Sequence, residues 1–392
     1  MISTSSLFTQ LLALIPRRKF RQAVASHKGQ QAAKGFSCWD QLVGMLFCHL
    51  ASAGSLREIH CGLATAQGKL RHLGLKKATS RSTLSYANNH RPWKIYRDTF
   101  YTVLESAQHL AAGRQRRFRF KNKVVSIDAS IIDLCCTVFD WARYRRTKGA
   151  IKLHLMLDHQ GYLPCWALVT EGNVHEVNSA RKLPFSSGTV VVCDRGYNDY
   201  NLFAQWCKEG VFFVTRLKSN ASYSVITAWE VPSNRNILAD EEICFTGSIA
   251  GQRCPHTLRR VVVWDATNER EIVLLTNNLK LGATTITQLY KDRWQVELFF
   301  KALKRNLKVK TFVGTSRNAV QIQIWTALVA MLLLKVMQFR SKLGWSLSHL
   351  AAMVRMNLMI YRDLWGWLDD PYANNATGPP DDDLPLFAHC LG

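Results

Sequence analysis

Residues 290–304 read YKDRWQVELFFKALK, and their spacing sets apart four polar residues, namely Tyr290, Arg293, Glu297 and Lys304. At the helical step of about 100° per residue, the last three lie about 300°, 340° and 320° round from the first. All four therefore share one face of a predicted helix, in a sector about 60° wide. Lys301 and Lys308 extend this face. A separate apolar stripe lies beside it, formed by Leu289, Val296, Phe300, Leu303 and Leu307.

This predicted face carries one carboxylate, Glu297, among several cations. On a helix that its apolar stripe anchors in a core, such an arrangement favours a metal ligand beside a phosphate backbone. A surface amphipathic helix with one acidic residue would show the same pattern. These residues alone leave both interpretations open.

Composition favours a globular protein with a polyanionic partner. Of 392 residues, 47% are hydrophobic and 20% are charged. The 51 Lys and Arg against 28 Asp and Glu give a formal charge of +23. Because each neutralised phosphate releases counterions, this excess favours nucleic acid. Ribosomal and membrane-surface proteins share such an excess, so charge alone does not specify a function.

The 11 cysteines are odd in number and form no C-x-x-C pair, which is typical of reduced cysteine and not of disulfides or a zinc site. The apolar run at residues 11–15 precedes the basic residues 17–19, the reverse of a secretory leader. The most apolar stretch, residues 324–334, is too short to span a bilayer. We therefore expect a soluble intracellular protein.

The first 112 residues are predicted to form a helical domain that binds DNA. The segment at 38–53 has apolar residues at helical spacing, Ser55 can cap the helix that follows, and Pro92 ends a further short helix. These helices are joined by basic turns, as in a helix-turn-helix reader, but many helical domains share this pattern, which favours a generic helical DNA-contacting domain.

Residues 113–218 are predicted to begin an α/β core. They start with the basic linker 113–123, and strand-like runs follow, with a hairpin expected around 159–161. The run TVVVCD, ending at Asp194, is typical of a strand covered on both faces. Three antiparallel strands that lead to buried central strands with flanking helices are similar to the ribonuclease-H-like order.

The rest of the chain divides into three predicted parts. Residues 219–283 contain strand-like runs separated by Asn, Gly and Pro, which indicates a β-rich insertion. Residues 284–368 return to the core and add C-terminal helices, among them a strongly apolar helix at 321–338. The tail 369–392 is polar and acidic, and is expected to be disordered.

Two aspartates are placed to act with Glu297 in phosphoryl transfer. Asp128 ends the strand-like run VVSID and Asp194 ends TVVVCD, with Asp133 and Asp140 as competitors for the first position. Two Mg²⁺ ions about 3.5–4 Å apart are held by such carboxylates in two-metal enzymes. The basic residues of the 290–304 helix would then hold a DNA strand near the ions.

Two motifs carry a resemblance to a known family. Residues 194–197 read DRGY, and the Y-x2-R-x3-E-x6-K spacing at 290–304 is complete. The chain resembles the IS4 family of bacterial insertion-sequence transposases, which are DDE enzymes. The likeness extends to GFSCWDQLV and RSTLSYANNHRPW near the N-terminus and to KGAIKLHLMLDHQGYLP in the core.

The resemblance implies roles for individual residues. Asp128, Asp194 and Glu297 would form the catalytic triad and bind two divalent ions, Mg²⁺ with Mn²⁺ as a possible substitute. The residues implied in DNA binding are Tyr290, Arg293, Lys304, Trp294, Arg195 and Lys301. Trp264, in the predicted insertion, is a second candidate to stack on a flipped base; for both tryptophans, packing in a core remains the alternative.

The resemblance also implies a reaction and its partners. The enzyme would cleave the ends of an insertion sequence and join the 3′-OH to target DNA by a cut-and-paste route, with a hairpinned DNA end in well-studied relatives. Its partners would be the terminal inverted repeats and target DNA, a homodimer would hold two ends in synapsis, and the protein would be cytoplasmic and nucleoid-associated. A catalytically silent DNA-binding repressor and a plain Mg²⁺-dependent nuclease are the alternatives.

Overall fold

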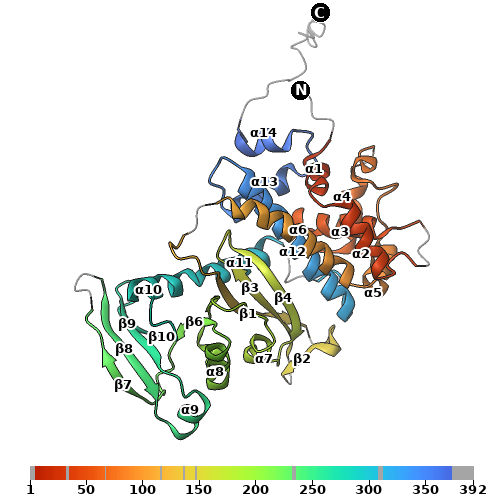
Figure 1. Cartoon of the computed structure of the whole chain (residues 1–392). Helices are drawn as coiled ribbons and strands as arrows, with labels where there is room; N and C mark the ends of the chain where they lie inside the picture. The colour runs from red at the N-terminus through yellow and green to blue at the C-terminus, as the bar shows by residue number, and fades with distance from the viewer. Residues whose placement is uncertain are drawn as a thin grey trace, which may run out of the picture.

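A computed structural model describes residues 5–31, 35–66, 68–114, 117–135, 137–145, 148–231, 235–307 and 312–372. Lys308, the side chain of Asp140 and the tail from residue 373 lie outside this description. Figure 1 shows a helical body at one end of the molecule and a long twisted sheet at the other, joined through α11 and the strands β1, β3 and β4.

The predicted N-terminal helices are present. Ser37 and Asp40 form a reciprocal capping box at the start of α3, and Ser55 accepts a hydrogen bond from the Glu58 amide at the start of α4, as predicted. The helix before Pro92 ends at His90. The elements are α1 (Leu7–Ala13), α2 (Arg17–Ser26), α3 (Cys38–Leu50), α4 (Leu56–Ala64), η1 (Leu70–Leu73), α5 (Arg81–His90) and α6 (Lys94–Ala112).

The C-terminal helices pack into the same helical body. These are α12 (Arg317–Arg340), α13 (Leu347–Asn357) and α14 (Leu364–Asp369). The apolar helix α12 runs between α3, α5 and α6 (Figure 1). It is long and apolar enough to cross a membrane, yet 94% of its most apolar window is buried inside the fold. The strongly apolar helix predicted at 321–338 is therefore present, and it packs in a core.

One mixed sheet runs through the rest of the molecule, in the order β2-β3-β1-β5-β6-β10-β9-β8-β7, with β4 paired to β3. β1 is parallel to β5, and β5 to β6, whereas β3 and β4 are antiparallel to their neighbours. The predicted hairpin around 159–161 joins β3 to β4. The strands at this end are β1 (Val124–Leu134), β2 (Arg143–Arg145), β3 (Lys148–Asp158), β4 (Leu163–Glu171), β5 (Val190–Val192) and β6 (Phe212–Arg216).

The strands expected between residues 219 and 283 form, and they extend this sheet. β10 pairs antiparallel with β6, and β9, β8 and β7 follow outward (Figure 1). Backbone hydrogen bonding across the β6–β10 edge makes the segment continuous with the core sheet, which the strand pattern of the sequence did not reveal. The elements are β7 (Tyr223–Ala228), β8 (Ile237–Phe245), α9 (Ser248–Arg253), β9 (Leu258–Asp265) and β10 (Arg270–Thr276).

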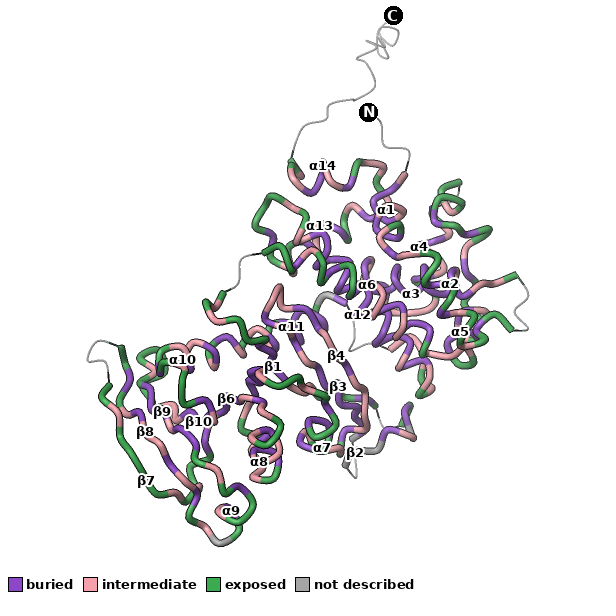
Figure 2. Tube along the Cα trace, in the orientation of Figure 1, coloured by how far each residue is buried: buried purple, intermediate pink, exposed green. Residues whose placement is uncertain are grey.

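Helices lie on both faces of the sheet around β5, whose residues are all buried. Figure 2 shows α10 and α8 on either side of β6, which both helices contact. Val190 and Val192 of β5 pack with Ile286 and Leu289 of α10, and Val191 packs on the opposite face with the residues of α8. The covering elements are α7 (Glu176–Ala180), η3 (Arg195–Tyr197), α8 (Tyr200–Lys208), α10 (Ala283–Asp292) and α11 (Trp294–Asn306), while η2 (Asp140–Ala142) lies beside β2.

Candidate active site

Two carboxylates lie beside each other on adjacent parallel strands. Asp128 was predicted to end its strand, but β1 continues to Leu134, because its second half pairs with β3, and Asp194 follows the end of β5 by two residues. Val124 pairs with Val190 and Ser126 with Val192 along β1 and β5. Continuing this register by two residues sets Asp128 opposite Asp194, and neighbouring strands lie about 4.8 Å apart. Because side chains alternate along a strand, both aspartates belong to the sheet face that α10 and α11 cover. The sequence-predicted pair is therefore brought together.

Local contacts hold both aspartates. Asp128 Oδ1 accepts a hydrogen bond from the Ala129 amide at 2.8 Å. Asp194 begins η3, and its Oδ1 accepts from the Gly196 amide at 2.9 Å. Thr215 Oγ1 of β6 donates to the Asp194 carbonyl at 3.0 Å. The DRGY motif is thus a turn that fixes the direction of Asp194.

The electrostatics of Asp128 are those of a crowded anionic site. The pKa of Asp128 is raised to about 7, chiefly by burial and also by the nearby charges of Asp194 and Glu297, against the opposing effects of the Ala129 hydrogen bond and Arg293. A carboxylate whose pKa is raised in this way is strongly stabilised in its charged form by a cation bound beside it.

The 290–304 stretch is not one continuous helix, which corrects the prediction. It divides into α10, which ends at Asp292, and α11, which begins at Trp294. At the break, the Arg293 amide bonds to the Tyr290 carbonyl and the Val296 amide to the Arg293 carbonyl, both three residues apart. This tighter turn changes the direction in which the side chains after it point. A uniform helical step of about 100° per residue therefore does not describe residues 290–304.

Arg293 connects the carboxylates across this break. Its Nη2 lies 2.6 Å from Glu297 Oε1 and its Nη1 lies 3.7 Å from Asp128 Oδ2. Its side chain is 13% exposed, and its Nε is buried without a hydrogen-bond partner among the described residues. The guanidinium therefore sits between the carboxylates and retains one unused donor.

The other signature residues surround this pair. The Arg293 guanidinium lies over the ring of Tyr290, 5.5 Å from its centroid, and burial raises the pKa of Tyr290. Lys304 Nζ donates to the Ile131 carbonyl of β1 at 2.7 Å, which ties the far end of α11 to the strand that carries Asp128. The four-residue signature thus packs α10 and α11 against β1.

The remaining predicted DNA-binding residues are spread more widely. Trp294 is 55% exposed at the start of α11, and Trp264 is 39% exposed on β9, opposite Glu271. Arg195 is exposed and lines a cavity of about 610 Å³ beside η3 and α7. Lys301 is exposed and lines a different, larger cavity. Neither tryptophan is buried in a core.

The three predicted carboxylates are suitable ligands for a divalent cation, although their side chains do not surround one metal position in the structure. Among the described residues, no three His, Cys, Asp or Glu side chains stand ready around one metal position. The oxygen donor set of Asp128, Asp194 and Glu297 nevertheless suits a hard cation, and burial together with the nearby charge of Asp194 raises the pKa of Asp128, so that its charged form lacks a sufficient positive partner. Asp133, the competing aspartate on β1, is exposed. It lies an odd number of residues from Asp128, so it belongs to the opposite face of the sheet.

A buried network beside the helix break was missed by the sequence analysis. Asp292 Oδ1 lies 2.7 Å from Arg117 Nη1, and Asp292 Oδ2 accepts from Tyr162 OH at 2.9 Å. His159 Nδ1 lies 3.0 Å from the same oxygen, at an ion-pair distance without hydrogen-bond geometry, and its Nε2 lies 2.7 Å from Ser126 Oγ. The sequence did contain an indication of this network, because Asp292 lies inside the Y-x2-R-x3-E-x6-K signature and His159 lies in the predicted hairpin.

This network connects the residues of a serine-hydrolase triad, but it cannot act as one. Ser126 is 0% exposed and His159 is 8% exposed, so no substrate reaches the serine hydroxyl. The network instead fastens the β3–β4 hairpin and the linker before β1 to the residue that precedes Arg293.

The chain is similar to known protein families and to known proteins. The family model "Transposase DDE domain" matches residues 119–333, and a "Domain of unknown function (DUF4372)" matches residues 3–76. The protein named as transposase y4zB from Sinorhizobium fredii is 29% identical over 300 residues, which cover 76% of this chain and 82% of that protein.

Two further relatives are transposases assigned to insertion sequences. The one for IS5377 of Geobacillus stearothermophilus is 27% identical over 67% of this chain and 68% of that protein. The one for IS4SA of Synechocystis sp. is 23% identical over 67% of this chain and 73% of that protein. A structure of the piggyBac transposase synaptic complex with hairpin DNA matches 94% of this chain and 83% of that chain at 12% identity, with a TM-score of 0.43.

The family model covers more than half of the chain, and the resemblance to IS4-family transposases is confirmed by these relatives. The chain belongs to the transposase DDE domain family and is a DNA transposase, an enzyme that uses divalent metal to cleave and join DNA strands.

Proposed function

We propose that this transposase hydrolyses the phosphodiester at the ends of its insertion sequence and joins the freed 3′-OH to target DNA by a cut-and-paste route. The observation that carries the proposal is the β1–β5 register, which sets Asp128 beside Asp194 under the helix that bears Glu297. The Arg293 ion pair links Glu297 to Asp128 across the same point. These three residues are the proposed catalytic carboxylates.

Asp128, Asp194 and Glu297 are proposed to hold two Mg²⁺ ions, for which Mn²⁺ can substitute. Bound there, the ions would supply Lewis acidity for the attacking and leaving oxygens. In the free protein, Arg293 lies within ion-pair distance of two of the three carboxylates, those of Asp128 and Glu297. With Glu297 bound to a cation, the Arg293 guanidinium would be left to donate hydrogen bonds to a DNA phosphate.

The wider architecture supports the remaining proposals. The strand order β4-β3-β1-β5-β6, with two parallel pairs after the antiparallel strands, supports a ribonuclease-H-like core. The segment 219–283 would then be an insertion that widens its sheet, and the helices of residues 1–112 would bind DNA. Exposed Trp294 is the favoured residue to stack on a flipped base at a DNA hairpin.

Two proposals concern assembly and location. Two ends must be cut and inserted together, so the active form would be a homodimer in a synaptic complex with the inverted repeats. The +23 charge suits an enzyme that works on the bacterial nucleoid in the cytoplasm.

The test uses purified protein, Mg²⁺ and a linear DNA that carries the sequences flanking the gene. We expect wild type to give nicked and joined products, and Glu297→Gln to lower both by at least about 10³-fold, because a lost metal ligand removes several kcal/mol of transition-state stabilisation. Glu209→Gln, an exposed glutamate at the end of α8, is the matched control and should react as wild type.

Each alternative gives a distinct pattern. Nicks without joined product would indicate a plain nuclease, and binding without nicks a DNA-binding repressor. Equal cleavage by Glu297→Gln and wild type would remove Glu297 from the site.

A further inference from the structure

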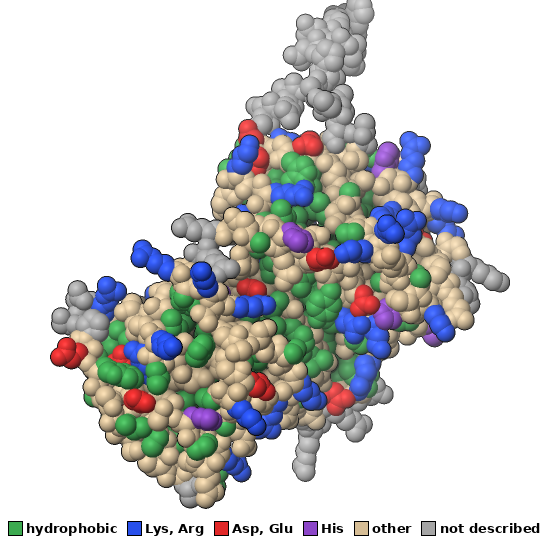
Figure 3. Space-filling model, in the orientation of Figure 1, with side chains coloured by type: hydrophobic (Ala, Val, Ile, Leu, Met, Phe, Trp, Pro, Cys, Tyr) green, Lys and Arg blue, Asp and Glu red, His purple; other side chains and the backbone are tan. Residues whose placement is uncertain are grey.

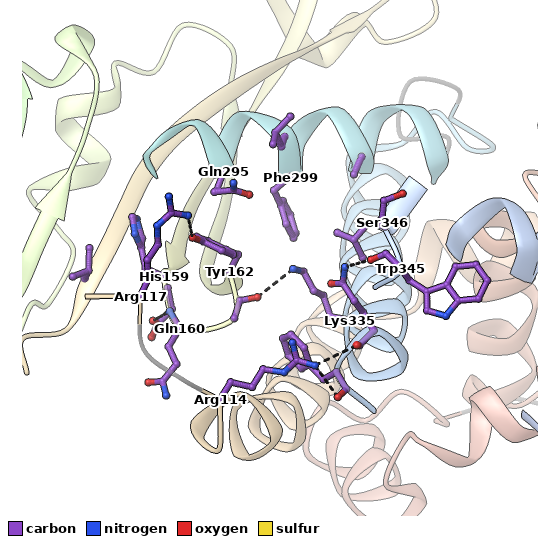
Figure 4. Close-up of a pocket in the computed structure, with 18 of the residues that line it drawn as sticks. Arg114, Arg117, His159, Gln160, Tyr162, Gln295, Phe299, Lys335, Trp345 and Ser346 are labelled. Carbon is purple, nitrogen blue, oxygen red and sulfur yellow. Dashed lines mark hydrogen bonds between the residues drawn. The ribbon is translucent and has the colours of Figure 1, made fainter. Parts of the chain in front are cut away.

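A large cleft lies beside α11. It has a volume of about 1310 Å³ and is enclosed by the linker before β1, the β3–β4 turn, α11 and the C-terminal end of α12 with the segment that follows it. Gln295 and Phe299 enter it from α11 (Figure 4). At about 100° per residue they lie about 160° round the helix from Glu297, while Lys301, which also lines the cleft, lies about 40° from it. Asp128, Asp194 and Glu297 do not line the cleft. The cleft is therefore distinct from the proposed catalytic pocket.

The lining is strongly cationic. Eight Lys or Arg residues line the cleft, against one carboxylate, Asp158. Four of the cations come from the basic linker, whose charge the catalytic site does not use; these are Arg114, Arg117, Lys121 and Lys123. The other four come from α11, α12 and the following segment, and are Lys301, Arg305, Lys335 and Lys342. On the face drawn in Figure 3, Lys and Arg side chains also cover more of the surface than Asp and Glu side chains.

Several of these charges have no acidic partner. Arg117 pairs with Asp292, Lys123 lies 3.7 Å from Asp158, and Lys342 lies 3.8 Å from Asp369. Arg114, Lys301, Arg305 and Lys335 are within ion-pair distance of no carboxylate in the described part of the chain. Arg114 instead donates to the Phe339 carbonyl at 2.8 Å. Repulsion among unpaired cations favours an anion between them.

Lys335 is the most informative of the four. Its Nζ donates to the Gly161 carbonyl at 3.1 Å and points from α12 toward the middle of the cleft (Figure 4). The residue is 6% exposed, and burial, with the charge of Arg114, lowers the pKa of Lys335 to about 8. A buried ammonium with one carbonyl partner is costly, and it is stabilised by a bound anionic oxygen.

We propose that this cleft binds the phosphate backbone of DNA, as a second contact surface beside the cleavage site. The inference rests on the proposed DNA-cleaving function and adds a place for the DNA beyond the scissile bond. Lys and Arg side chains bound to phosphates position a duplex without reading its sequence. The contact is therefore independent of DNA sequence.

The first test measures the affinity for a duplex of arbitrary sequence over a series of salt concentrations. Each lost phosphate contact lowers the slope of log affinity against log salt by about 0.9, so Arg114→Gln/Arg305→Gln should lower it by about 1.8. The matched control is Lys208→Gln/Arg253→Gln, two exposed cations of α8 and α9 that pack on the other face of the sheet. This control variant loses the same two positive charges, and its slope of log affinity against log salt should equal that of wild type. Equal slopes for the two double variants would overturn the proposal.

The second test separates binding from folding. Lys335→Met removes the buried ammonium, so the free protein should unfold at the same or a higher temperature while its affinity for the duplex falls about tenfold. A lower unfolding temperature with unchanged affinity would make Lys335 a structural residue and contradict the proposal. Nicking by wild type is scored separately, so failure of the cleavage proposal and failure of the cleft proposal give different results.

Discussion

At the scale of single residues, Arg293 and Asp128 set the chemistry of the site. Arg293 neutralises part of a cluster in which Asp128 lies close to two further carboxylates. The contact is strong enough to keep the pKa of Arg293 above its ordinary value: burial lowers it, and Tyr290, Glu297 and Asp128 more than reverse that effect. The guanidinium thus holds the carboxylates in place, and a divalent cation competes with it for them.

The pKa of Asp128 predicts how stability varies with pH. A carboxyl whose pKa is raised in the folded state, here to about 7 from 3.8, binds more protons folded than unfolded between these values. The free energy of unfolding therefore falls as pH rises through this window. Asp128→Asn removes the penalty, so in chelated buffer it should be more stable than wild type by about 1–3 kcal/mol at pH 8 and nearly equal to it at pH 4.

Urea denaturation at several pH values checks this prediction. Added Mg²⁺ should stabilise wild type more than Asp128→Asn. Asp133→Asn, an exposed aspartate on the same strand, is the control. A stability difference for Asp128→Asn that does not depend on pH would show that Asp128 is charged throughout the range.

At the scale of elements, the β3–β4 turn joins the two parts of the molecule. His159 and Tyr162 hold Asp292 at the α10–α11 break, while the Gly161 carbonyl accepts from Lys335 of α12. One turn therefore contacts the catalytic helices and the core helix of the helical body. The linker joins the same network through Arg117. The position of Glu297 depends on this turn as well as on its own helix.

A substitution at Gly161 tests this junction. Its φ is +82°, and an added Cβ would lie 2.8 Å from Phe339 Cζ and 3.0 Å from Ala111 Cβ. Gly161→Ala should cost about 2–4 kcal/mol, the sum of the left-handed backbone and the clash. Gly188 also has a φ of +82°, but its nearest neighbour would be Asn122 Nδ2 at 3.5 Å. Gly188→Ala should cost about 1 kcal/mol. Equal losses of unfolding free energy in urea would show that the turn is loosely packed.

At the scale of the whole molecule, folding does not follow the linear order of the predicted domains. α12 lies more than 200 residues from α3, yet it packs on α3, α5 and α6. His49 of α3 bonds through Nδ1 to the Leu307 carbonyl at 2.8 Å and through Nε2 to Thr326 Oγ1 at 3.0 Å. Burial lowers the pKa of His49 to about 4, in keeping with a neutral ring inside a shared core. The helical body is therefore built from both ends of the chain.

This packing predicts how fragments behave. Residues 1–112 alone leave the faces of α3 and α6 that α12 covers open to water, so the fragment should aggregate or unfold without cooperativity. The same residues joined by a flexible linker to 312–372 should give a cooperative thermal transition. Circular dichroism of both proteins is the measurement. A cooperative transition in 1–112 by itself would show an autonomous domain.

The sequence by itself determined the local elements and the chemistry. The cap at Ser55, the strand-like runs that contain Asp128 and lead to Asp194, and the signature with Glu297 follow from spacing and residue type, because capping, alternation and charge act over a few residues. Only the tertiary structure decided what lies between distant segments. The break at Arg293, the network around Asp292, the joining of β10 to β6 and the place of α12 depend on contacts between segments far apart in the chain. No local pattern encodes such contacts, since each is set by the shape and polarity of a surface that another part of the chain provides.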